Sequence, residues 1–134
     1  MKISVRWLLV ALLLVVAGCA GVGSLAQKSR EQVVSERADA RWHYLIKGDF
    51  KAAYDYLSPS YRSAVSLDEY RAGLKEGLWT GVEVRAVQCP EEDVCKVEVD
   101  VDYAYILKGR SVPGKRSLQE TWRKDMGQWW NVPE

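Results

Sequence analysis

The sequence has few histidines and cysteines, the residues that hold zinc most often. Its 134 residues include one histidine, His43, and three cysteines. Two of these cysteines, Cys89 and Cys95, are close together, but a zinc site on this pair would need two further ligands, and His43 is far away in the sequence. The sequence therefore predicts no metal site.

An excess of charge of either sign is also missing. The chain carries 19 basic and 18 acidic residues, and residues 1–18 hold two of the basic ones, Lys2 and Arg6, and none of the acidic ones. With or without this leader, the balance gives no electrostatic reason to bind nucleic acid. It gives no reason to expect a patch for acidic lipids either. We therefore expect no nucleic-acid partner and no such patch.

Catalytic motifs are missing too. The sequence has no glycine-rich phosphate loop and no persuasive arrangement of serine, histidine and aspartate. A general base must lie within reach of a substrate in a dry pocket. His43 is expected on a helix, satisfied or exposed, and Asp100 and Asp102 are expected on the solvated face of a strand. We therefore assign no catalytic residue and no cofactor.

What is present begins with an apolar leader. Lys2 and Arg6 precede an uninterrupted apolar run, Trp7–Ala17, after which a small residue leads to Cys19. A charged start, a short apolar run and small residues before a cut site are typical of a secretory signal. The run is shorter than the ~20 residues of a membrane span. The alternative is an uncut membrane anchor that extends to Ala26.

The end of the leader resembles the lipobox of bacterial lipoproteins. Residues Val16–Cys19 are Val-Ala-Gly-Cys, and the family pattern is an aliphatic residue, two small residues and an obligatory cysteine. The resemblance implies that residues 1–18 are a signal peptide and that the thiol of Cys19 carries a diacylglyceryl group. Two or three acyl chains would then hold the protein in the membrane. Ala20 rather than aspartate follows the cysteine, which in a cell with two membranes implies the outer one, facing the periplasm.

The chain after the leader is long enough for one domain with a core. We expect residues 19–26 to form a lipidated tether and residues 27–134 to form the domain. Outside the cytoplasm two nearby cysteines usually oxidise, so Cys89 and Cys95 are predicted to form a disulfide. A reduced pair and a metal site are the alternatives.

Helical spacing dominates the first part of the domain. A helix is predicted between Gln27 and Lys47, ended by Gly48, and Asp49 caps a second, shorter helix. The buried stripe of the first helix is Val34, Ala38, Trp42 and Leu45. Its wetter sides are expected to carry Glu31, Glu36, Arg37 and Arg41. Two more helical segments follow, in "SPSYRSAV" and in "SLDEYRAGL", the latter with a Ser66–Glu69 capping box. Its inward residues are expected to be Leu67, Tyr70 and Leu74.

The period changes to two in the second half. Residues 95–107 alternate, which predicts a strand with one dry and one wet face. The dry face is Cys95, Val97, Val99, Val101, Tyr103, Tyr105 and Leu107; the wet face includes Lys96, Glu98, Asp100 and Asp102. "TGVEVRAVQC" is predicted as its hairpin partner, with "PEED" at the turn. Gly109–Lys115 is expected to be a turn, and "RSLQETWRK" and "QWWNV" to be two further strands joined by Asp125–Gly127.

Helices followed by a four-stranded antiparallel meander predict an α+β fold with the helices on one face. Residues 40–73, with strands that end in "ETWRKDMGQWWNV", resemble the nuclear-transport-factor-2-like (cystatin-like) superfamily. The resemblance lies in the aromatic first helix, the Gly48-Asp49 break, "SPSYR" and the closing tryptophan-rich hairpin. It implies a curved sheet around a long helix, enclosing a conical cavity. The candidate pocket residues are Trp42, His43, Tyr103, Tyr105 and Trp122, for which core packing or exposure is the alternative.

Two classes of function stay open. The first is a non-catalytic envelope lipoprotein whose domain binds a partner protein or a small apolar ligand near the membrane. The second is a small-molecule isomerase or dehydratase that uses the conical cavity, as some members of the superfamily do. Two or more ionisable groups converging in the cavity would favour the enzyme, whereas an apolar lining would favour packing or a lipid-like ligand.

Two surfaces are candidates for protein contacts. The superfamily often dimerises through the outer face of the sheet, so the resemblance implies a candidate homodimer. Trp129 and Trp130 are neighbours in a strand and point to opposite faces, so one is expected to be buried and the other exposed. The exposed one is either a protein contact or ordinary edge packing.

Overall fold

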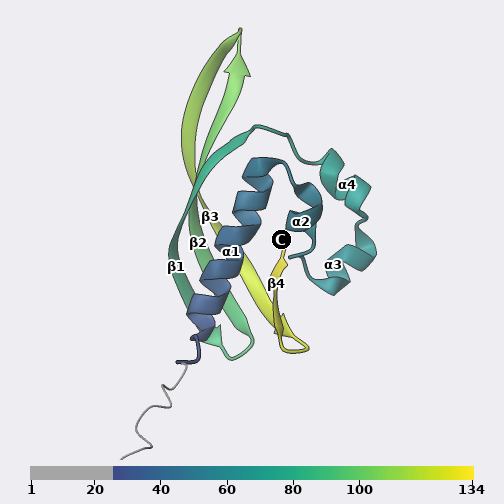
Figure 1. The fold of residues 1–134 in the computed structure, drawn as a ribbon, viewed down its shortest axis with the longest axis vertical. Coiled ribbons are helices and arrows are strands. Elements are labelled where there is room, and N and C mark those ends of the chain that lie inside the picture. The colour runs from purple at the N-terminus through teal and green to yellow at the C-terminus, as the bar shows by residue number, and fades with distance from the viewer. Residues whose placement is uncertain (1–25) are drawn as a thin grey trace, which may run out of the picture.

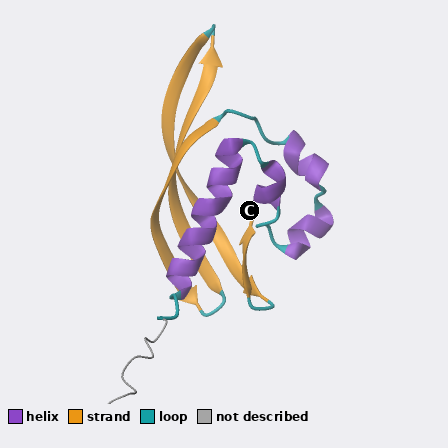
Figure 2. Cartoon of the chain, in the orientation of Figure 1, coloured by secondary structure: helices purple, strands orange, loops and turns teal. Residues whose placement is uncertain are grey.

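The computed structural model describes residues 26–134. The predicted signal peptide, the lipobox with Cys19 and the tether up to residue 25 lie outside the described residues. In the described part, the elements are α1 (Arg30–Lys47), α2 (Phe50–Tyr54), α3 (Pro59–Ala64), α4 (Leu67–Ala72), β1 (Trp79–Glu91), β2 (Val94–Leu107), β3 (Arg110–Asp125) and β4 (Gln128–Val132). The strands form one antiparallel sheet in the order β1-β2-β3-β4, and the helices lie on one face of it (Figures 1 and 2). The predicted α+β meander is confirmed.

Capping groups set the two ends of α1. The Ser29 hydroxyl oxygen accepts a hydrogen bond from the Gln32 N–H (3.1 Å), and the Gln32 side chain accepts one from the Ser29 N–H (2.9 Å). This capping box starts the helix at Arg30 rather than at Gln27, where the apolar spacing alone predicts it. Gly48 ends the helix as predicted, with a φ of 76° that glycine adopts without a Cβ penalty.

The predicted caps of α2 and α4 are also confirmed. The Asp49 carboxylate accepts a hydrogen bond from the Ala52 N–H, and Ser66 and Glu69 form a reciprocal capping box. The backbone N–H and the hydroxyl of Ser66 donate to the Glu69 carboxylate and hold the pKa of Glu69 below its usual value. In α4 and just after it, Tyr70 is buried and both Leu67 and Leu74 are half-buried, so the predicted inward face is correct.

The core lies between α1 and the middle of β2. On the helix, the predicted stripe of Val34, Ala38, Trp42 and Leu45 is buried. On the strand, Cys95, Val97, Val99 and Val101 are fully buried. Each such aliphatic side chain contributes about 1.5–3 kcal/mol when it leaves water. The helix–sheet contact therefore supplies a large part of the stabilisation. Within residues 26–134, none of the helices combines the length and the apolarity that crossing a membrane requires.

The dry face of β2 ends earlier than the alternation predicts. Tyr105 and Leu107 belong to that face by sequence, but both are exposed. The reason is that β1 pairs with β2 only as far as Tyr103, and β2 then continues with β3 alone, past the ends of the helices (Figure 1). Alternation assigns a side chain to a face but does not provide a layer to cover it.

The turn between β2 and β3 is shorter than predicted. The structure confines it to Lys108 and Gly109, both with positive φ (49° and 77°), whereas the whole of Gly109–Lys115 was expected to be a turn. Two consecutive residues with positive φ match the twist of paired strands. Pro113 fits within β3 because that part of the strand is an edge: β4 begins to pair with β3 only at Thr121.

The helical layer is tied to the free edge of β4. The Ser58 N–H donates to the Asn131 oxygen (2.9 Å), and the Asn131 N–H donates to the Tyr56 oxygen (2.8 Å). Between them, Leu57 is fully buried and bridges to Asn131 in parallel. The segment after α2 thereby closes this side of the sheet.

The predicted disulfide joins β1 to β2. Cys89 and Cys95 are bonded on either side of the turn at Glu92 and Asp93. Cys95 is fully buried in the core and Cys89 is half-buried. The bond therefore staples the two strands at the end of the sheet near the start of α1 (Figure 1).

Replacing Cys89 by alanine is expected to lower the free energy of unfolding by about 2 kcal/mol. Two cysteines six residues apart close a small loop, which restricts the unfolded chain only modestly. Urea unfolding followed by tryptophan fluorescence measures the loss. Reduction of the wild-type protein should produce a loss of the same size. Unchanged unfolding midpoints in both experiments would show that the bond does not stabilise the domain.

Candidate functional site

The five predicted pocket residues do not come together in one place. Trp42 and Trp122 are both buried between α1 and the sheet. Tyr103 is half-buried near the end of β2, and its ring stacks on that of Tyr105 with the centroids 6.4 Å apart. His43 is exposed, and its Nδ1 lies 2.8 Å from a backbone oxygen one turn earlier in α1. Only the two tryptophans of this group share an interior site.

A row of aromatic rings leads from this interior towards the end of β2. Trp42 packs edge-on against Trp79 with the centroids 5.3 Å apart, and Trp79 packs edge-on against Tyr103 at 6.4 Å. Such edge-to-face pairs contribute about 0.5–1.5 kcal/mol beyond their burial. Tyr103 thus packs against other rings.

The two buried tryptophans meet at a carboxylate that the sequence reasoning missed, Glu120 of β3. Its Oε1 accepts hydrogen bonds from the Trp42 indole N–H and from the Arg41 guanidinium, both at 2.8 Å. Its Oε2 accepts one from the Trp122 indole N–H at 3.0 Å. The side chains of Arg41 and Glu120 are 11% and 9% exposed. A buried charge is costly unless it is paired and hydrogen-bonded, and here three donors, one of them charged, meet that requirement.

The position of this ion pair follows from two periodicities. Strand alternation puts Leu118, Glu120 and Trp122 on one face of β3, the face towards the helices. On α1, Arg41 directly precedes Trp42 of the buried stripe. The prediction that Arg41 lies on a wetter side of the helix was wrong, because its guanidinium turns inward to Glu120. An acidic residue between apolar ones on the dry face of a strand was the available signal.

Two further polar atoms in this interior have no hydrogen-bond partner among residues 26–134. They are the Nε of Arg41 and the hydroxyl of Tyr70. Both residues are 9% exposed. Burial raises the pKa of Tyr70, and the nearby guanidinium of Arg41 partly offsets this effect. A buried polar group without a partner costs about 1–3 kcal/mol, so these two atoms reduce the stability of the interior.

A small cleft reaches this polar interior from the edge of the sheet, where β4 ends. Its volume is about 170 Å³, less than the roughly 300–1,000 Å³ of a usual small-molecule pocket. It is lined by Arg41, Gln119, Glu120, Thr121, Asn131, Val132, Pro133 and Glu134. The cleft has room for a few waters or a small anion.

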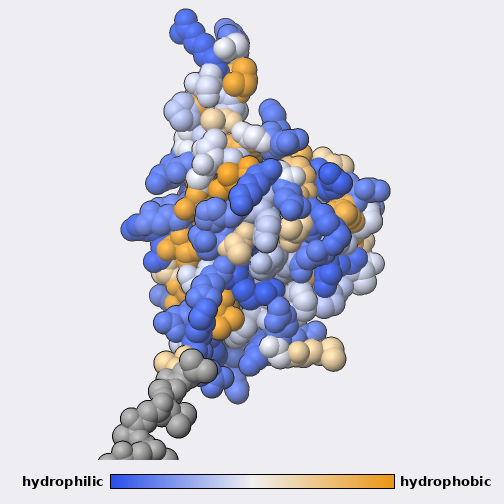
Figure 3. Space-filling model, viewed as in Figure 1, coloured by the Kyte–Doolittle hydropathy of each residue, from blue (hydrophilic) through white to orange (hydrophobic). Residues whose placement is uncertain are grey.

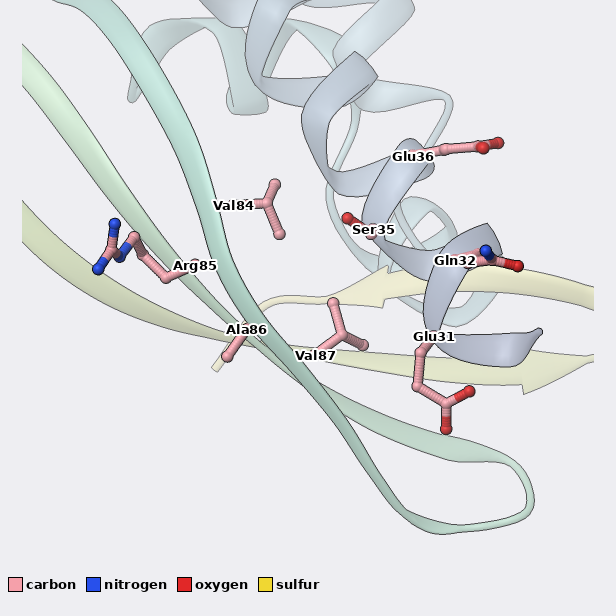
Figure 4. Close-up of a pocket in the computed structure, with 8 residues that line it drawn as sticks. All are labelled: Glu31, Gln32, Ser35, Glu36, Val84, Arg85, Ala86 and Val87. Atoms are coloured by element: carbon pink, nitrogen blue, oxygen red, sulfur yellow. The ribbon is translucent and has the colours of Figure 1, made fainter. Parts of the chain in front are cut away.

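A larger groove, of about 400 Å³, lies between the first turns of α1 and strand β1 (Figure 4). Val84 and Val87 point towards the helix, whereas Arg85 points away from it. This spacing of three is explained by an irregularity in the pairing of β1 between Val84 and Ala86, which shifts the alternation. The helix side of the groove is formed by Glu31, Gln32, Ser35 and Glu36. The groove therefore has an apolar floor and a polar rim, whose two carboxylates pair with Lys28 and Arg30.

The paired carboxylates of β2 lie on the opposite face of the sheet from the core, as predicted. Asp100 accepts a hydrogen bond from the Ser117 hydroxyl and lies 3.8 Å from Arg85. Asp102 lies 3.5 Å from Lys115. Neither carboxylate reaches the interior. In the part of the chain that the structure describes, no three histidine, cysteine or acidic residues gather as metal ligands do.

The neighbouring tryptophans of β4 pack at the edge of the domain. Trp129 is buried and Trp130 is half-buried. The guanidiniums of Arg62 and Arg37 lie 5.3 and 5.8 Å from the Trp130 ring, within cation–π distance. Arg37, predicted on a wetter side of α1, is half-buried over the Tyr56 ring and donates to the Trp129 oxygen, and burial lowers its pKa. Of the two alternatives for the second tryptophan, the contacts favour edge packing.

Replacing Glu120 by glutamine keeps the shape of the side chain but leaves the charge of Arg41 buried without a carboxylate. We expect the free energy of unfolding to fall by about 3–5 kcal/mol, measured by urea denaturation. The double variant Arg41→Met with Glu120→Met should recover part of this loss, because no unpaired charge is then buried. A Glu120→Gln variant as stable as the wild type would contradict the role given to the ion pair.

Known proteins share the fold of this chain but indicate no activity for it. No family model matches the chain, and no curated protein matches it. Among solved structures, a SEC-C motif containing protein from Rhodopseudomonas palustris is 18% identical over 72% of this chain and 73% of that chain, with a TM-score of 0.58. A Campylobacter jejuni protein described as an NTF2-like transpeptidase is 17% identical over 74% of this chain and 96% of that chain, with a TM-score of 0.48. The likeness to the Rhodopseudomonas protein is one of fold alone.

Proposed function

We propose that this protein is a bacterial envelope lipoprotein, held in the membrane by acyl chains on Cys19. The support is the Val16–Cys19 sequence with the charged start and the short apolar run before it. Since α1 begins at Arg30, roughly ten residues separate the domain from that cysteine, and they span at most about 35 Å. The domain would therefore work close to the bilayer, and Ala20 favours the periplasmic side of an outer membrane.

The domain itself is proposed to be nuclear-transport-factor-2-like, with a cone formed by the sheet and α1. The order of the elements supports this, with a long first helix, a Gly48-Asp49 break, short helices and then a meander. The closing β3–β4 hairpin with its tryptophans fits the same pattern. In this proposal the interior of the cone is the region around Glu120.

Within this domain we propose a binding function without catalysis. The observation that carries the proposal is the engagement of Glu120, the carboxylate of the interior. A general base needs a lone pair directed at the substrate proton. Both oxygens of Glu120 already accept hydrogen bonds from Arg41 and the two tryptophans. The carboxylate therefore serves as a structural partner in the helix–sheet interface.

The proposed binding site is the groove between α1 and β1. Its volume, about 400 Å³, lies in the usual range for small ligands, and its floor of Val84 and Val87 suits an apolar chain. The groove adjoins the first turns of α1, which lie only a short stretch of sequence after Cys19. A lipid-like ligand or an apolar segment of an envelope protein close to the bilayer would therefore reach it.

An isomerase or dehydratase is the second candidate function. Three groups that exchange or stabilise protons, those of Arg41, Glu120 and Tyr70, converge in the interior, and the Arg41 Nε and the Tyr70 hydroxyl have no partner among residues 26–134. A substrate small enough for the 170 Å³ cleft would meet Arg41 and Glu120 there. This candidate requires Glu120 to exchange a tryptophan hydrogen bond for one to the substrate.

Intact-mass analysis tests the lipoprotein proposal. The protein expressed in full length in a bacterium and recovered from membranes should begin at Cys19 and carry the added mass of its acyl chains. The Cys19→Ser variant should keep residues 1–18 and carry no lipid. An unmodified wild-type chain that still begins with Met1 would contradict the proposal.

A groove-filling variant tests the proposed binding site. The wild-type protein is purified from membranes in mild detergent, and the lipids and proteins that accompany it are identified by mass spectrometry. In the Ser35→Arg variant the new side chain should occupy the groove and lower the amount of accompanying ligand at least tenfold. Ser63→Arg, on the exposed face of α3, is the matched control and should retain it. Equal recovery with both variants, or no accompanying molecule with the wild type, would count against this site.

A further inference from the structure

Strands β2 and β3 extend beyond the rest of the domain as a two-stranded ribbon. The last pair between β1 and β2 joins Trp79 to Tyr103, and the Ala104 N–H still donates to the Leu78 oxygen; from Tyr105 to Val112 the two strands pair only with each other. Figure 1 shows this ribbon rising past the helices, at the opposite end of the domain from the start of α1. Two paired strands without further support are only marginally stable in water. The ribbon has no hydrophobic core of its own that would explain its apolar residues.

The tip of the ribbon is apolar on both faces. Tyr105, Ile106 and Leu107 are 40%, 69% and 53% exposed. Because successive strand residues point to opposite faces, Ile106 lies on one side of the ribbon and the other two lie on the opposite side. These are three of the four large hydrophobic residues exposed within residues 26–134; the fourth is Met126, at the other end of the sheet. An apolar tip of this kind is suited to a partner that contacts both faces of the ribbon at once.

Basic side chains lie beside the apolar tip. Lys108 in the turn and Arg110 at the start of β3 are exposed there, whereas the exposed Lys115 and Arg116 lie further down β3, opposite Asp102 and Val101. From residue 102 to residue 116 the sequence has one acidic side chain, Asp102, which lies 3.5 Å from Lys115. The near-zero charge of the whole chain hides this local excess of cations. Figure 3 shows hydrophobic and strongly hydrophilic side chains side by side on the projecting end.

We propose that the tip of this ribbon docks on a bilayer that contains anionic phospholipids. Its three apolar side chains enter the boundary between headgroups and acyl chains, and the basic side chains contact the headgroup phosphates. Buried apolar surface together with cations near an anionic surface is the combination that holds proteins at membrane interfaces. A protein groove would cover one face of a strand or pair with its edge. Apolar residues on both faces, with two basic side chains beside them, fit an acyl layer beneath an anionic surface better.

The direction of the ribbon implies contact with a second membrane. The chain enters α1 at one end of the domain and the tip projects from the other (Figure 1). A protein anchored through its N-terminal segment would therefore present the tip away from its own bilayer. This proposal does not depend on the lipid at Cys19, because an uncut apolar leader would also anchor the chain at its N-terminal end.

A vesicle-bridging experiment with the full chain tests the proposal. The protein is reconstituted into sucrose-loaded phosphatidylcholine vesicles, which sediment. Fluorescent vesicles of phosphatidylcholine, with or without phosphatidylglycerol, are then added, and the lipid concentration that gives half-maximal capture is measured. We expect capture of the anionic vesicles and little capture of the neutral ones. Capture should weaken as the salt concentration rises.

Two pairs of substitutions separate the charged from the apolar contribution. Lys108→Gln with Arg110→Gln should weaken capture about twenty-five-fold, at about fivefold for each basic side chain. Ile106→Ser with Leu107→Ser should weaken it at least tenfold at the same charge. The matched controls at the opposite end of the sheet are Arg123→Gln with Lys124→Gln and, for the apolar contribution, Met126→Ser. Both controls should capture vesicles as the wild type does.

The outcomes that would overturn the proposal are distinct. Failure of the wild-type protein to capture anionic vesicles at low salt would do so, and would leave a protein or a second copy of the chain as the partner of the tip. Capture that the tip substitutions do not change, or that the controls weaken equally, would also overturn it. Because all four tip residues are exposed, the variants should keep the unfolding midpoint of the wild type, and this is measured alongside.

Discussion

The carboxylate of Glu120 is the point at which the helical layer and the sheet are locked together. The first helix contributes the guanidinium of Arg41 and the indole of Trp42, and β3 contributes Glu120 itself and the indole of Trp122. A buried charge held by three donors tolerates little displacement, because each lost hydrogen bond leaves a polar group without water. The ion pair therefore fixes both the rotation of α1 and its position along the sheet. The aromatic row and the groove beside β1 depend on that position.

The sheet is longer than the layer that covers it. Helix α1 has 18 residues and spans about 27 Å, whereas β2 has 14 residues and spans about 45 Å. The first part of β2 carries fully buried valines, and its last residues extend beyond the ends of the helices (Figure 1). The same alternating strand thus serves first as a core and then as an exposed ribbon. Both the groove and the ribbon tip follow from how far the helix reaches along the strands.

The sequence predicts best those features in which one residue decides local geometry. Gly48 ends a helix because its backbone adopts a positive φ. The alternation of β2 assigns side chains to the two faces of the strand independently of the rest of the chain. Features that need two distant residues were missed: nothing in the spacing pairs Arg41 with Glu120. The prediction of a turn over the whole of Gly109–Lys115 was wrong for a related reason. Proline and glycine are tolerated in a strand that has a free edge, so these residues can belong to β3. The exposure of Leu107 depends on where another layer ends, which periodicity does not encode.

Hydrogen exchange of the indole N–H groups tests the central claim most directly. If Trp42 and Trp122 donate to a buried Glu120, their indole protons should exchange only when the domain opens, and nitrogen-resolved NMR of the labelled protein should show both signals long after transfer to deuterated water. Neutralising the carboxylate should accelerate the exchange of both indoles together. Exchange of these two indoles as fast as that of a solvent-exposed tryptophan would contradict the account.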